Sequence, residues 1–405
     1  MKKVTFVFLI LALLVMTGIT GYAFFDKTTV SESERRELAT APEFSAEAWK
    51  NSEYQQQLEN FIGDHVWNRE YFITIGNRLE EAVRLPGKSL ILKDVTEKDD
   101  GNDNRTEVMV LSDRIVPLYN HSDDNLVYFF ESCSQLFSMM PDVINQYFMI
   151  APGRIEYEED EVTSLSGSAQ SDALLVYQNM DDSITNVPVF DAVGEGVSEH
   201  GINNIYYRTD HHWSQLGAYY AAQEFLKAAG KEQVDLDDYE CMQGYDFQGY
   251  LTVKYGKENV IDPDPAVYYI PKDGKICPEN VYWKDENTGD IVIRNEEVLD
   301  PNRGGYYCFV EESQFAYAVI DGKKDDGSAL MVVSDSYGLA LVTWLTEAYD
   351  TIIVVDPRYY EGVDTQFYEL FAEYHVTDFL LCLQAEEMRV NLFNVKMAEN
   401  LLGVK

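Results

Sequence analysis

Short apolar runs that alternate with helical segments constrain the fold of this chain more than any other feature. The runs 146–150, 351–355 and 378–383 have the length of buried strands, and patterns of helical period cover 171–180 and 366–375. Strands separated by helices usually pair in parallel, because each helix returns the chain to the same edge of the sheet. Three more strands are expected, at 108–111, 115–118 and 187–190. The sequence therefore predicts an α/β fold with a mainly parallel sheet flanked by helices.

The run 329–338 indicates a buried strand that ends in a turn of small residues. Leu339, Val342 and Leu345 follow at helical spacing, so Ser336 is expected between a strand and a helix. Free N–H groups at a helix start can stabilise an oxyanion, and the ends of parallel strands border the usual ligand crevice. We expect Ser336 to be a nucleophile. Its structural alternative is a helix N-cap, a role that serine often takes.

The segment Asp210-His211-His212-Trp213 contains the best candidate for a general base. A carboxylate bonded to one imidazole nitrogen fixes the tautomer, so the other nitrogen can take a proton from a hydroxyl and return it later. Asp210 precedes His212 by two residues, and an amphipathic helix is expected over 215–229. We expect Asp210 to orient His212, with His211 as a scaffold or rim residue. Trp213 is expected either to pack and hold the loop or to form an aromatic floor for a sugar ring.

A metal site built on Asp210, His211 and His212 is the competing interpretation of this segment. Adjacent side chains on an extended segment point to opposite faces, so they rarely converge on one ion. The chain also lacks an HExxH or paired CxxC pattern that would supply further ligands. We therefore expect no metal and no cofactor.

Residues 231–316 interrupt the α/β alternation between the expected base and nucleophile. The segment is rich in Gly, Pro, Asp and Tyr, so we expect a β-rich insertion that shapes access to the site. Within it, Gly249 is either a backbone donor to an oxyanion or part of a simple tight turn. Arg358 follows an expected strand end and is predicted either to bind substrate or to pair with Asp356.

An apolar run over 4–25 follows Lys2 and Lys3, and acidic sequence follows the run. About 22 residues are enough to cross a bilayer, and flanking positive charge stays on the cytoplasmic side. We expect residues 1–25 to form an uncleaved membrane anchor that leaves the body of the protein extracytoplasmic. The alternative is a removable signal peptide and a secreted protein, because Gly21-Tyr22-Ala23 has the pattern of a cleavage site.

The rest of the chain is long enough for one large domain with added segments. Residues 26–107 are expected to form a stalk and a helical extension that packs on the main domain, with helices at 46–61 and 71–84. Residues 108–405 are expected to form the main domain, including the insertion. The predicted organisation is therefore an anchor, a helical extension and one catalytic domain.

The chain is strongly acidic, with a formal net charge of −39. Binding a nucleic acid would require a basic surface, which this composition hardly permits. The charge also disfavours anionic acceptors, whereas a neutral polysaccharide meets less electrostatic opposition. We therefore expect no nucleic-acid partner.

Several motifs together carry a resemblance to a known family. The most specific are Asp210–Trp213, with Tyr206-Tyr207-Arg208-Thr209 before it and Gly217-Ala218 after it, and Ser334-Asp335-Ser336-Tyr337. Further matching segments are 34–39 with Pro42, 64–69, 247–250 and 355–360. Through these residues the chain resembles the DHHW family, which is similar to the SGNH-like extracytoplasmic subunits of alginate and other polysaccharide O-acetyltransferases. Ser334 departs from the pattern, because the family's turn often carries glycine there.

The resemblance implies an SGNH-hydrolase-like fold and a specific set of site residues. Ser336 would be the nucleophile, His212 the general base and Asp210 the orienting acid, in the chain order of the acetyltransferase branch. Triads are defined by geometry, so this order does not argue against one. The candidate substrate-binding or oxyanion residues are Gly249, Arg358, Tyr337 and Trp213.

The expected reaction is acyl transfer by double displacement. Ser336, deprotonated by His212, would take an acetyl group and pass it to a hydroxyl of a cell-surface polysaccharide or exopolysaccharide. The resemblance implies a multipass membrane-bound O-acyltransferase as the source of the acetyl group. Two alternatives stay open: a carbohydrate acetyl esterase with the same triad, and a non-catalytic, membrane-anchored protein that binds or assembles polysaccharide.

Overall fold

The computed structural model describes residues 18, 21–28, 30–31, 36–42, 44–45, 49–50, 53–66, 90–93, 107–141, 143–284, 291–303, 305–310, 315–360, 367–389 and 391–402. The chain divides into two compact units. One comprises Met1–Lys88 with Thr252–Ile261, and the other comprises Ser89–Leu251 with Asp262–Lys405. All candidate site residues belong to the second, larger unit.

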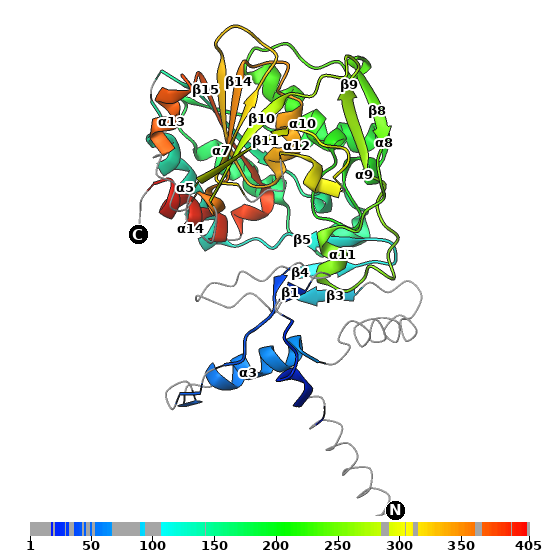
Figure 1. Cartoon of the computed structure of the whole chain (residues 1–405). Coiled ribbons are helices and arrows are strands. Elements are labelled where there is room, and N and C mark those ends of the chain that lie inside the picture. Colours follow the sequence, from blue (N-terminus) through cyan, green and yellow to red (C-terminus); the bar gives the residue numbers. More distant parts are fainter. Residues whose placement is uncertain are drawn as a thin grey trace, which may run out of the picture. The chain divides into compact units, whose positions relative to one another are not determined.

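The larger unit is built on an eight-stranded mixed sheet (Figure 1). In sheet order its strands are β11 (Ile291–Glu297), β10 (Pro278–Lys284), β12 (Tyr317–Asp321), β14 (Thr351–Val355), β13 (Ala329–Ser334), β15 (Asp378–Gln384), β6 (Asn145–Ala151) and β7 (Ile184–Asn186). The strands from β14 to β7 pair in parallel, and β11, β10, β12 and β14 pair antiparallel. The predicted α/β class with a mostly parallel sheet is confirmed.

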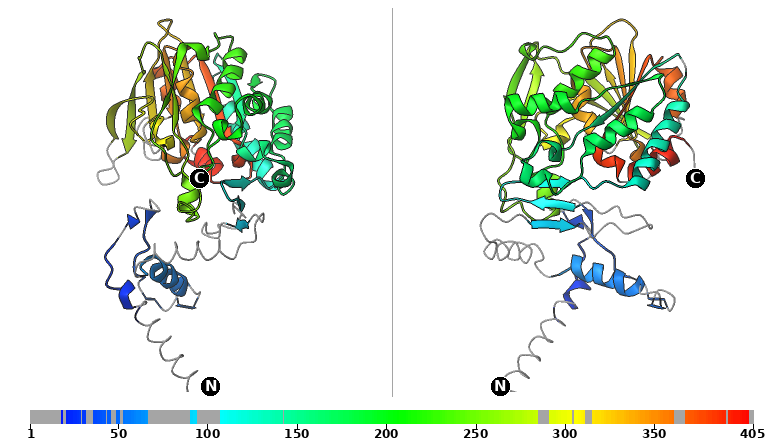
Figure 2. Two further views of the ribbon diagram at one scale, coloured as in Figure 1. Left: turned by 90° about the vertical axis from the view of Figure 1, so that its right-hand side faces the viewer. Right: turned by 180° about the vertical axis from the view of Figure 1, so that it is seen from behind.

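Helices cover both faces of this sheet (Figure 2). Along β13, Leu330 and Val332 point into one buried cluster and Met331 and Val333 into another, as the two-residue period of a strand requires. Burial on both faces explains why the parallel strands have continuous apolar sequences. The first cluster includes residues of α8 (Phe190–His200), α10 (Gln215–Ala228) and α12 (Tyr337–Thr343). The second includes residues of α5 (Asp123–Ser138), α7 (Ala169–Asn179), α13 (Phe367–Glu373) and α14 (Asn391–Asn400).

Smaller elements lie outside the main sheet. A three-stranded antiparallel sheet consists of β3 (Leu90–Lys93), β4 (Glu107–Val110) and β5 (Ile115–Leu118), and a two-stranded one of β8 (Tyr239–Gln243) and β9 (Val267–Pro271). The short helices of this unit are η1 (Arg154–Tyr157), α6 (Asp160–Thr163), α9 (Ile202–Ile205), η2 (Leu236–Asp238), η3 (Gly305–Cys308), η5 (Pro357–Tyr359) and η6 (Ala385–Met388). A further short helix, α11 (Tyr250–Lys254), has its first two residues in the larger unit and its last three in the smaller one. The strands expected at 108–111 and 115–118 therefore exist as β4 and β5, but outside the main sheet.

The prediction of a strand at 187–190 is wrong. The edge strand β7 ends at Asn186, and α8 begins at Phe190. Val187 still donates its N–H to the carbonyl of Phe148, but Pro188 has no N–H to continue the ladder. Val187 and Val189 are apolar because they are buried in a core connection, which local sequence does not distinguish from a strand.

The segment 231–316 contributes to the main sheet as well as lying between its strands. Its hairpin of β10 and β11 extends the sheet beyond β12, in antiparallel register from Glu279 opposite Ile320 to Tyr282 opposite Tyr317. The insertion is β-rich, as its composition predicts. Its loops around residues 247–250, 264 and 306 contact the predicted site.

The smaller unit contains β1 (Val30–Ser31), β2 (Arg36–Glu37) and α3 (Glu53–Asp64). The helix expected at 46–61 corresponds in part to α3, and the helix expected at 71–84 lies outside the described residues. None of the helices among the described residues is long and apolar enough to cross a membrane. The apolar run 4–25 is described only at residues 18 and 21–25, so the anchor stays a prediction.

Candidate active site

Ser336 lies where the buried strand β13 turns into α12. Between residues 329 and 346, all of which the structure describes, Ser336 is the one residue that is not buried. It occupies the N-cap position of α12, yet its side chain makes no capping hydrogen bond. The Tyr337 N–H instead donates a hydrogen bond to Asp335 Oδ1, at 2.9 Å. The Ser336 hydroxyl is therefore free for another partner, contrary to the N-cap alternative.

That partner is His212. Its Nε2 lies 2.7 Å from Ser336 Oγ, and its Nδ1 lies 2.7 Å from Asp210 Oδ1. Both the imidazole and the carboxylate are nearly buried, with side-chain exposures of 10% and 7%. The structure thus brings the three predicted catalytic residues together in the serine–histidine–aspartate arrangement that activates a hydroxyl.

Asp210 is held as an anion by its surroundings. Burial alone would raise the pKa of its carboxyl group, but the charge and hydrogen bond of His212 outweigh burial and hold the pKa below its ordinary value. The backbone N–H groups of His212 and Tyr250 also donate to this carboxylate, at 3.2 and 2.8 Å. A carboxylate fixed in this way presents one lone pair to His212 Nδ1, so Nε2 can act as the base.

Asp264, in the insertion, holds the loop that carries Asp210 and His212, a role that no sequence motif predicted. Its side chain is buried and accepts hydrogen bonds from the backbone N–H groups of Arg208 and Thr209, at 2.9 and 2.8 Å. It also accepts from Thr209 Oγ1 at 2.6 Å and pairs with the Arg208 guanidinium at 3.1 Å. No local pattern marks Asp264, because its partners lie about 55 positions earlier in the chain.

Gly249 does not act as the predicted oxyanion donor in this structure. Its N–H donates to Thr209 Oγ1 at 2.9 Å, so that donor is already occupied. A Cβ at this position would lie 2.5 Å from Asp210 Cβ and 2.6 Å from the backbone of Thr209. The glycine is required because the two loops approach closely, which neither the oxyanion nor the simple-turn interpretation anticipated.

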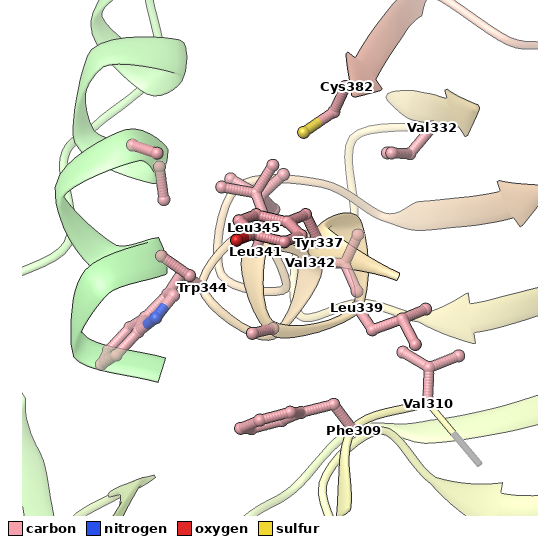
Figure 3. Packing of buried hydrophobic residues seen from close by; sticks show 14 of the residues in the cluster. Phe309, Val310, Val332, Tyr337, Leu339, Leu341, Val342, Trp344, Leu345 and Cys382 are labelled. Atoms are coloured by element: carbon pink, nitrogen blue, oxygen red, sulfur yellow. The ribbon is translucent and has the colours of Figure 1, made fainter. Parts of the chain in front are cut away.

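Trp213 and Tyr337 are fully buried, which argues against direct contact of either side chain with substrate. Trp213 Nε1 donates to the Tyr337 carbonyl at 3.1 Å, and the Tyr337 hydroxyl donates to the His211 carbonyl at 2.6 Å. These reciprocal bonds fasten the base loop to the start of α12. Figure 3 shows Tyr337 among Leu341, Val342 and the other buried side chains of this helix. Of the two interpretations of Trp213, packing is the one that the structure shows.

Arg358 is engaged by a neighbouring carboxylate. Its Nε and Nη2 donate to Asp356 Oδ1 and Oδ2 at 3.0 and 2.6 Å, a two-point ion pair. Burial alone would lower the pKa of Arg358, but the charge of Asp356 raises it above its ordinary value. The Asp356–Arg358 pair is therefore present, which was the structural alternative to substrate binding.

Asp335 ties the serine turn to the neighbouring strand. Its Oδ2 accepts a hydrogen bond from the Gln384 N–H at 2.7 Å, in addition to the bond that its Oδ1 accepts from the Tyr337 N–H. Burial raises the pKa of Asp335 to about 6, although these N–H donors oppose the shift. The turn that carries Ser336 is therefore anchored on both sides, even with Ser334 in place of the usual glycine.

His211 and His212 lie side by side, contrary to the expectation that their side chains diverge. Their ring centroids are 3.9 Å apart, because residues 206–213 form a tight loop closed by a bridge between Tyr206 and Trp213. Donor atoms of Asp210, His211 and His212 lie within 4.8 Å of one another, close enough to consider an ion. Both imidazoles direct Nδ1 at Asp210 Oδ1, at 3.4 and 2.7 Å, so the carboxylate occupies the point where they converge. This arrangement fits a hydrogen-bonded relay better than a metal centre.

A separate hollow of about 720 Å³ lies elsewhere on the larger unit. Its lining residues come from η1, α7 and α8, and none of the three predicted catalytic residues belongs to them. The lining is Glu156, Tyr157, Gln170, Phe190, Asp191, Gly194, Glu195, Ser198 and Glu199. Volume alone therefore does not locate the chemistry of this protein.

The fold is shared with solved structures of low sequence identity. A DHHW family protein from Eubacterium siraeum is 23% identical, with a TM-score of 0.60 over 76% of this chain and 99% of that one. PatB1 from Bacillus cereus, solved with a sulfonyl adduct, is 14% identical, with a TM-score of 0.57 over 73% and 98% of the two chains. The O-acetyltransferase domain of Pseudomonas putida AlgJ is 13% identical over 70% and 93%, but its TM-score of 0.37 does not establish a common fold.

Sequence comparison gives a more specific result than these structures. No curated protein matches the chain. The family described as DHHW protein matches residues 99–355, which is more than half of the sequence and includes Asp210, His212, Ser336 and the insertion. The chain belongs to the DHHW protein family.

Proposed function

We propose that this protein is an extracytoplasmic O-acetyltransferase that carries an acetyl group on Ser336 to a hydroxyl of a cell-surface polysaccharide or exopolysaccharide. The observation that carries the proposal is the relay from Asp210 through His212 to Ser336, with both contacts at 2.7 Å. Within its buried strand and helix, only the serine reaches the surface. A nucleophile that is both activated and accessible fits group transfer better than a purely structural role.

The first half of the reaction forms the acyl-enzyme. Ser336 Oγ attacks the carbonyl carbon of the acetyl donor while His212 Nε2 takes the hydroxyl proton. The bond from that carbon to the donor's oxygen or sulfur then breaks, and the leaving group takes the proton from His212. The backbone N–H of Ser336, at the start of α12, is a candidate donor to the oxyanion.

The second half transfers the acetyl group to the sugar. The acceptor hydroxyl gives its proton to His212 Nε2 as its oxygen attacks the acetyl carbon. The bond to Ser336 Oγ breaks, and Ser336 recovers its proton from the imidazolium. Asp210 stabilises that imidazolium in both halves, because its carboxylate stays charged beside Nδ1.

Three further observations bear on the nucleophile and its substrate. The motifs around His212 and Ser336 resemble those of polysaccharide O-acetyltransferase subunits, in the same chain order. PatB1 shares the fold and was solved with a sulfonyl adduct. We expect a sulfonyl reagent to react in the same way with Ser336, which is partly exposed. The acidic composition favours a neutral acceptor polymer over an anionic one.

The membrane setting is part of the proposal. The apolar run 4–25 would anchor the chain and leave the triad outside the cytoplasm. A multipass membrane-bound O-acyltransferase would supply the acetyl group at that surface. Anchoring keeps Ser336 close to this supply, which raises its effective concentration there.

The first test uses the full-length protein in detergent with 4-nitrophenyl acetate. Intact-mass analysis is expected to show one added acetyl group, located on Ser336 by peptide mapping. Ser336→Ala and His212→Ala should show none, whereas Ser334→Ala removes a neighbouring buried hydroxyl and should still be labelled. Absence of any adduct or turnover in the wild type would sink the catalytic proposal and leave a polysaccharide-binding protein.

The second test separates transfer from hydrolysis. Neutral oligosaccharides are added to the acetylated protein, and acetylated sugar is measured against free acetate. Transfer predicts acetylated sugar that depends on Ser336. Free acetate alone, across several acceptors, would identify an esterase instead.

A further inference from the structure

Tyr306 lies directly against the proposed base. It belongs to η3 of the insertion, and its ring is parallel to the His212 imidazole, with centroids 3.8 Å apart and an interplanar angle of 7°. Its hydroxyl donates to the carbonyl of Ser336 at 2.8 Å. One buried side chain therefore contacts both the base and the backbone of the nucleophile.

The imidazole of His212 is enclosed on both faces. His211 lies at 3.9 Å with a tilt of 35°, and two rings at such distances cannot share one face of an imidazole. Rotation of His212 about its Cβ–Cγ bond would drive its ring into Tyr306. The stack therefore keeps Nε2 directed at Ser336 Oγ and Nδ1 at Asp210.

Tyr306 is itself held in place before any substrate binds. Phe309 meets its ring edge-on at 5.2 Å, and Tyr207 at 6.4 Å. Gly305 precedes it with φ of +67°, and a Cβ there would lie 2.6 Å from Phe247. Burial raises the pKa of the Tyr306 hydroxyl well above its ordinary value, so the group stays a hydrogen-bond donor.

We propose that Tyr306 is a positioning residue for acyl transfer, which fixes the plane of His212 by stacking and fixes the serine turn through the Ser336 carbonyl. The inference rests on the proposed function. Two contacts from one rigid side chain set the distance between base and nucleophile, and a misplacement of about 1 Å can cost on the order of 100-fold in rate. The tyrosine face also attracts the imidazolium that forms in each half-reaction. The insertion thus completes the site rather than only covering it.

The experiment measures how fast Ser336 reacts with phenylmethanesulfonyl fluoride in the full-length protein. Ser336 Oγ attacks sulfur, the S–O bond forms, the S–F bond breaks, His212 takes the proton and fluoride leaves. The reagent is small, so its rate reports on the relay rather than on binding of a polymer. Tyr306→Leu removes the stack and the hydroxyl, and Tyr306→Phe removes the hydroxyl alone.

Tyr306→Leu is expected to slow labelling by about tenfold or more, because the imidazole becomes free to rotate. Tyr306→Phe should slow labelling less than Tyr306→Leu does, because the stack remains and only the hydrogen bond to the Ser336 carbonyl is lost. The matched control is Tyr282→Leu, which removes a tyrosine stacked at 4.1 Å on Tyr317 in the sheet and should leave the rate unchanged. With 4-nitrophenyl acetate the change should appear in kcat more than in KM. If the leucine variant does not fold, Tyr306→Met fills similar space without a ring and takes its place.

The outcomes separate this inference from the proposed function. A folded leucine or methionine variant that labels at the wild-type rate overturns the positioning role, even if Ser336→Ala abolishes labelling. A phenylalanine variant as slow as the leucine variant overturns the stacking argument and leaves only the hydroxyl bond to Ser336. Labelling that persists in Ser336→Ala refutes the proposed function itself.

Discussion

Gly338, in the first turn of α12, packs against the side chain of Ser334 at the end of β13. A Cβ added to Gly338 would lie 2.1 Å from Ser334 Oγ and 2.5 Å from Ser334 Cβ, and the next atom, Val332 Cγ1, would be 3.8 Å away. Ser334 is buried, and its hydroxyl has no hydrogen-bond partner within the described structure. The obstacle to a larger residue at Gly338 is therefore one side chain, at the position where the family's turn often carries glycine.

This geometry predicts that the effect of Gly338→Ala on the free energy of unfolding changes sign when Ser334 is also replaced by glycine. In the wild type, Gly338→Ala should destabilise the protein by about 1–3 kcal/mol, because the buried Cβ cannot shift away from Ser334. In a Ser334→Gly background the same substitution should stabilise it by up to about 1 kcal/mol, because alanine favours the helix over glycine. The expected coupling is about 1–4 kcal/mol from these two terms. Ser334→Ala should rescue only partly, because it keeps the Cβ contact.

Urea unfolding monitored by tryptophan fluorescence measures the free energies of the four variants, and sulfonyl fluoride labelling of Ser336 reports on the turn. Gly338→Ala should also slow labelling, since a displaced α12 moves Ser336 away from His212. Additive effects, with Gly338→Ala equally costly in both backgrounds, would refute the reasoning. That result would mean that the close approach of Ser334 and Gly338 does not limit the turn.

Two further predictions concern the catalytic loop. Asp264→Ala should destabilise the larger unit by about 3–5 kcal/mol and slow the labelling of Ser336. The reason is that it leaves the Arg208 guanidinium and two backbone N–H groups without their buried partner. Urea unfolding and labelling rates test this prediction, and unchanged values in both would contradict it. The folded-state pKa of Asp210 lies below its ordinary value, so its ionised form contributes stability above about pH 4 that is lost as the pH falls. On acidification from about pH 5 to pH 3, the wild type should therefore lose unfolding free energy relative to Asp210→Asn, by at most about 1.4 kcal/mol per pH unit. If the difference in unfolding free energy between the two proteins stays constant over this range, the pKa of Asp210 is not lowered in the folded state.

The sequence alone determined the α/β class and the chemical types at the site. Strands buried on both faces must be apolar, and helices must show a 3.6-residue period, so both appear in local sequence. The Asp-x-His spacing and the serine between a strand and a helix are also local features, and they pointed to Asp210, His212 and Ser336. The structure brings these three together, although His212 and Ser336 are separated by 124 positions.

Only the tertiary structure decided which other residues act at the site and how. Asp264 and Tyr306 have no local signature, because their roles come from partners about 55 and 30 positions away. Gly249, Trp213 and Tyr337 have conspicuous sequence contexts, but burial and occupied hydrogen bonds assign them to packing rather than to substrate. An extended segment would separate the side chains of His211 and His212, but a bridge between Tyr206 and Trp213 closes the segment into a tight loop and brings the two rings together. Periodicity and residue type are encoded locally, while distances between remote side chains arise only when the chain packs.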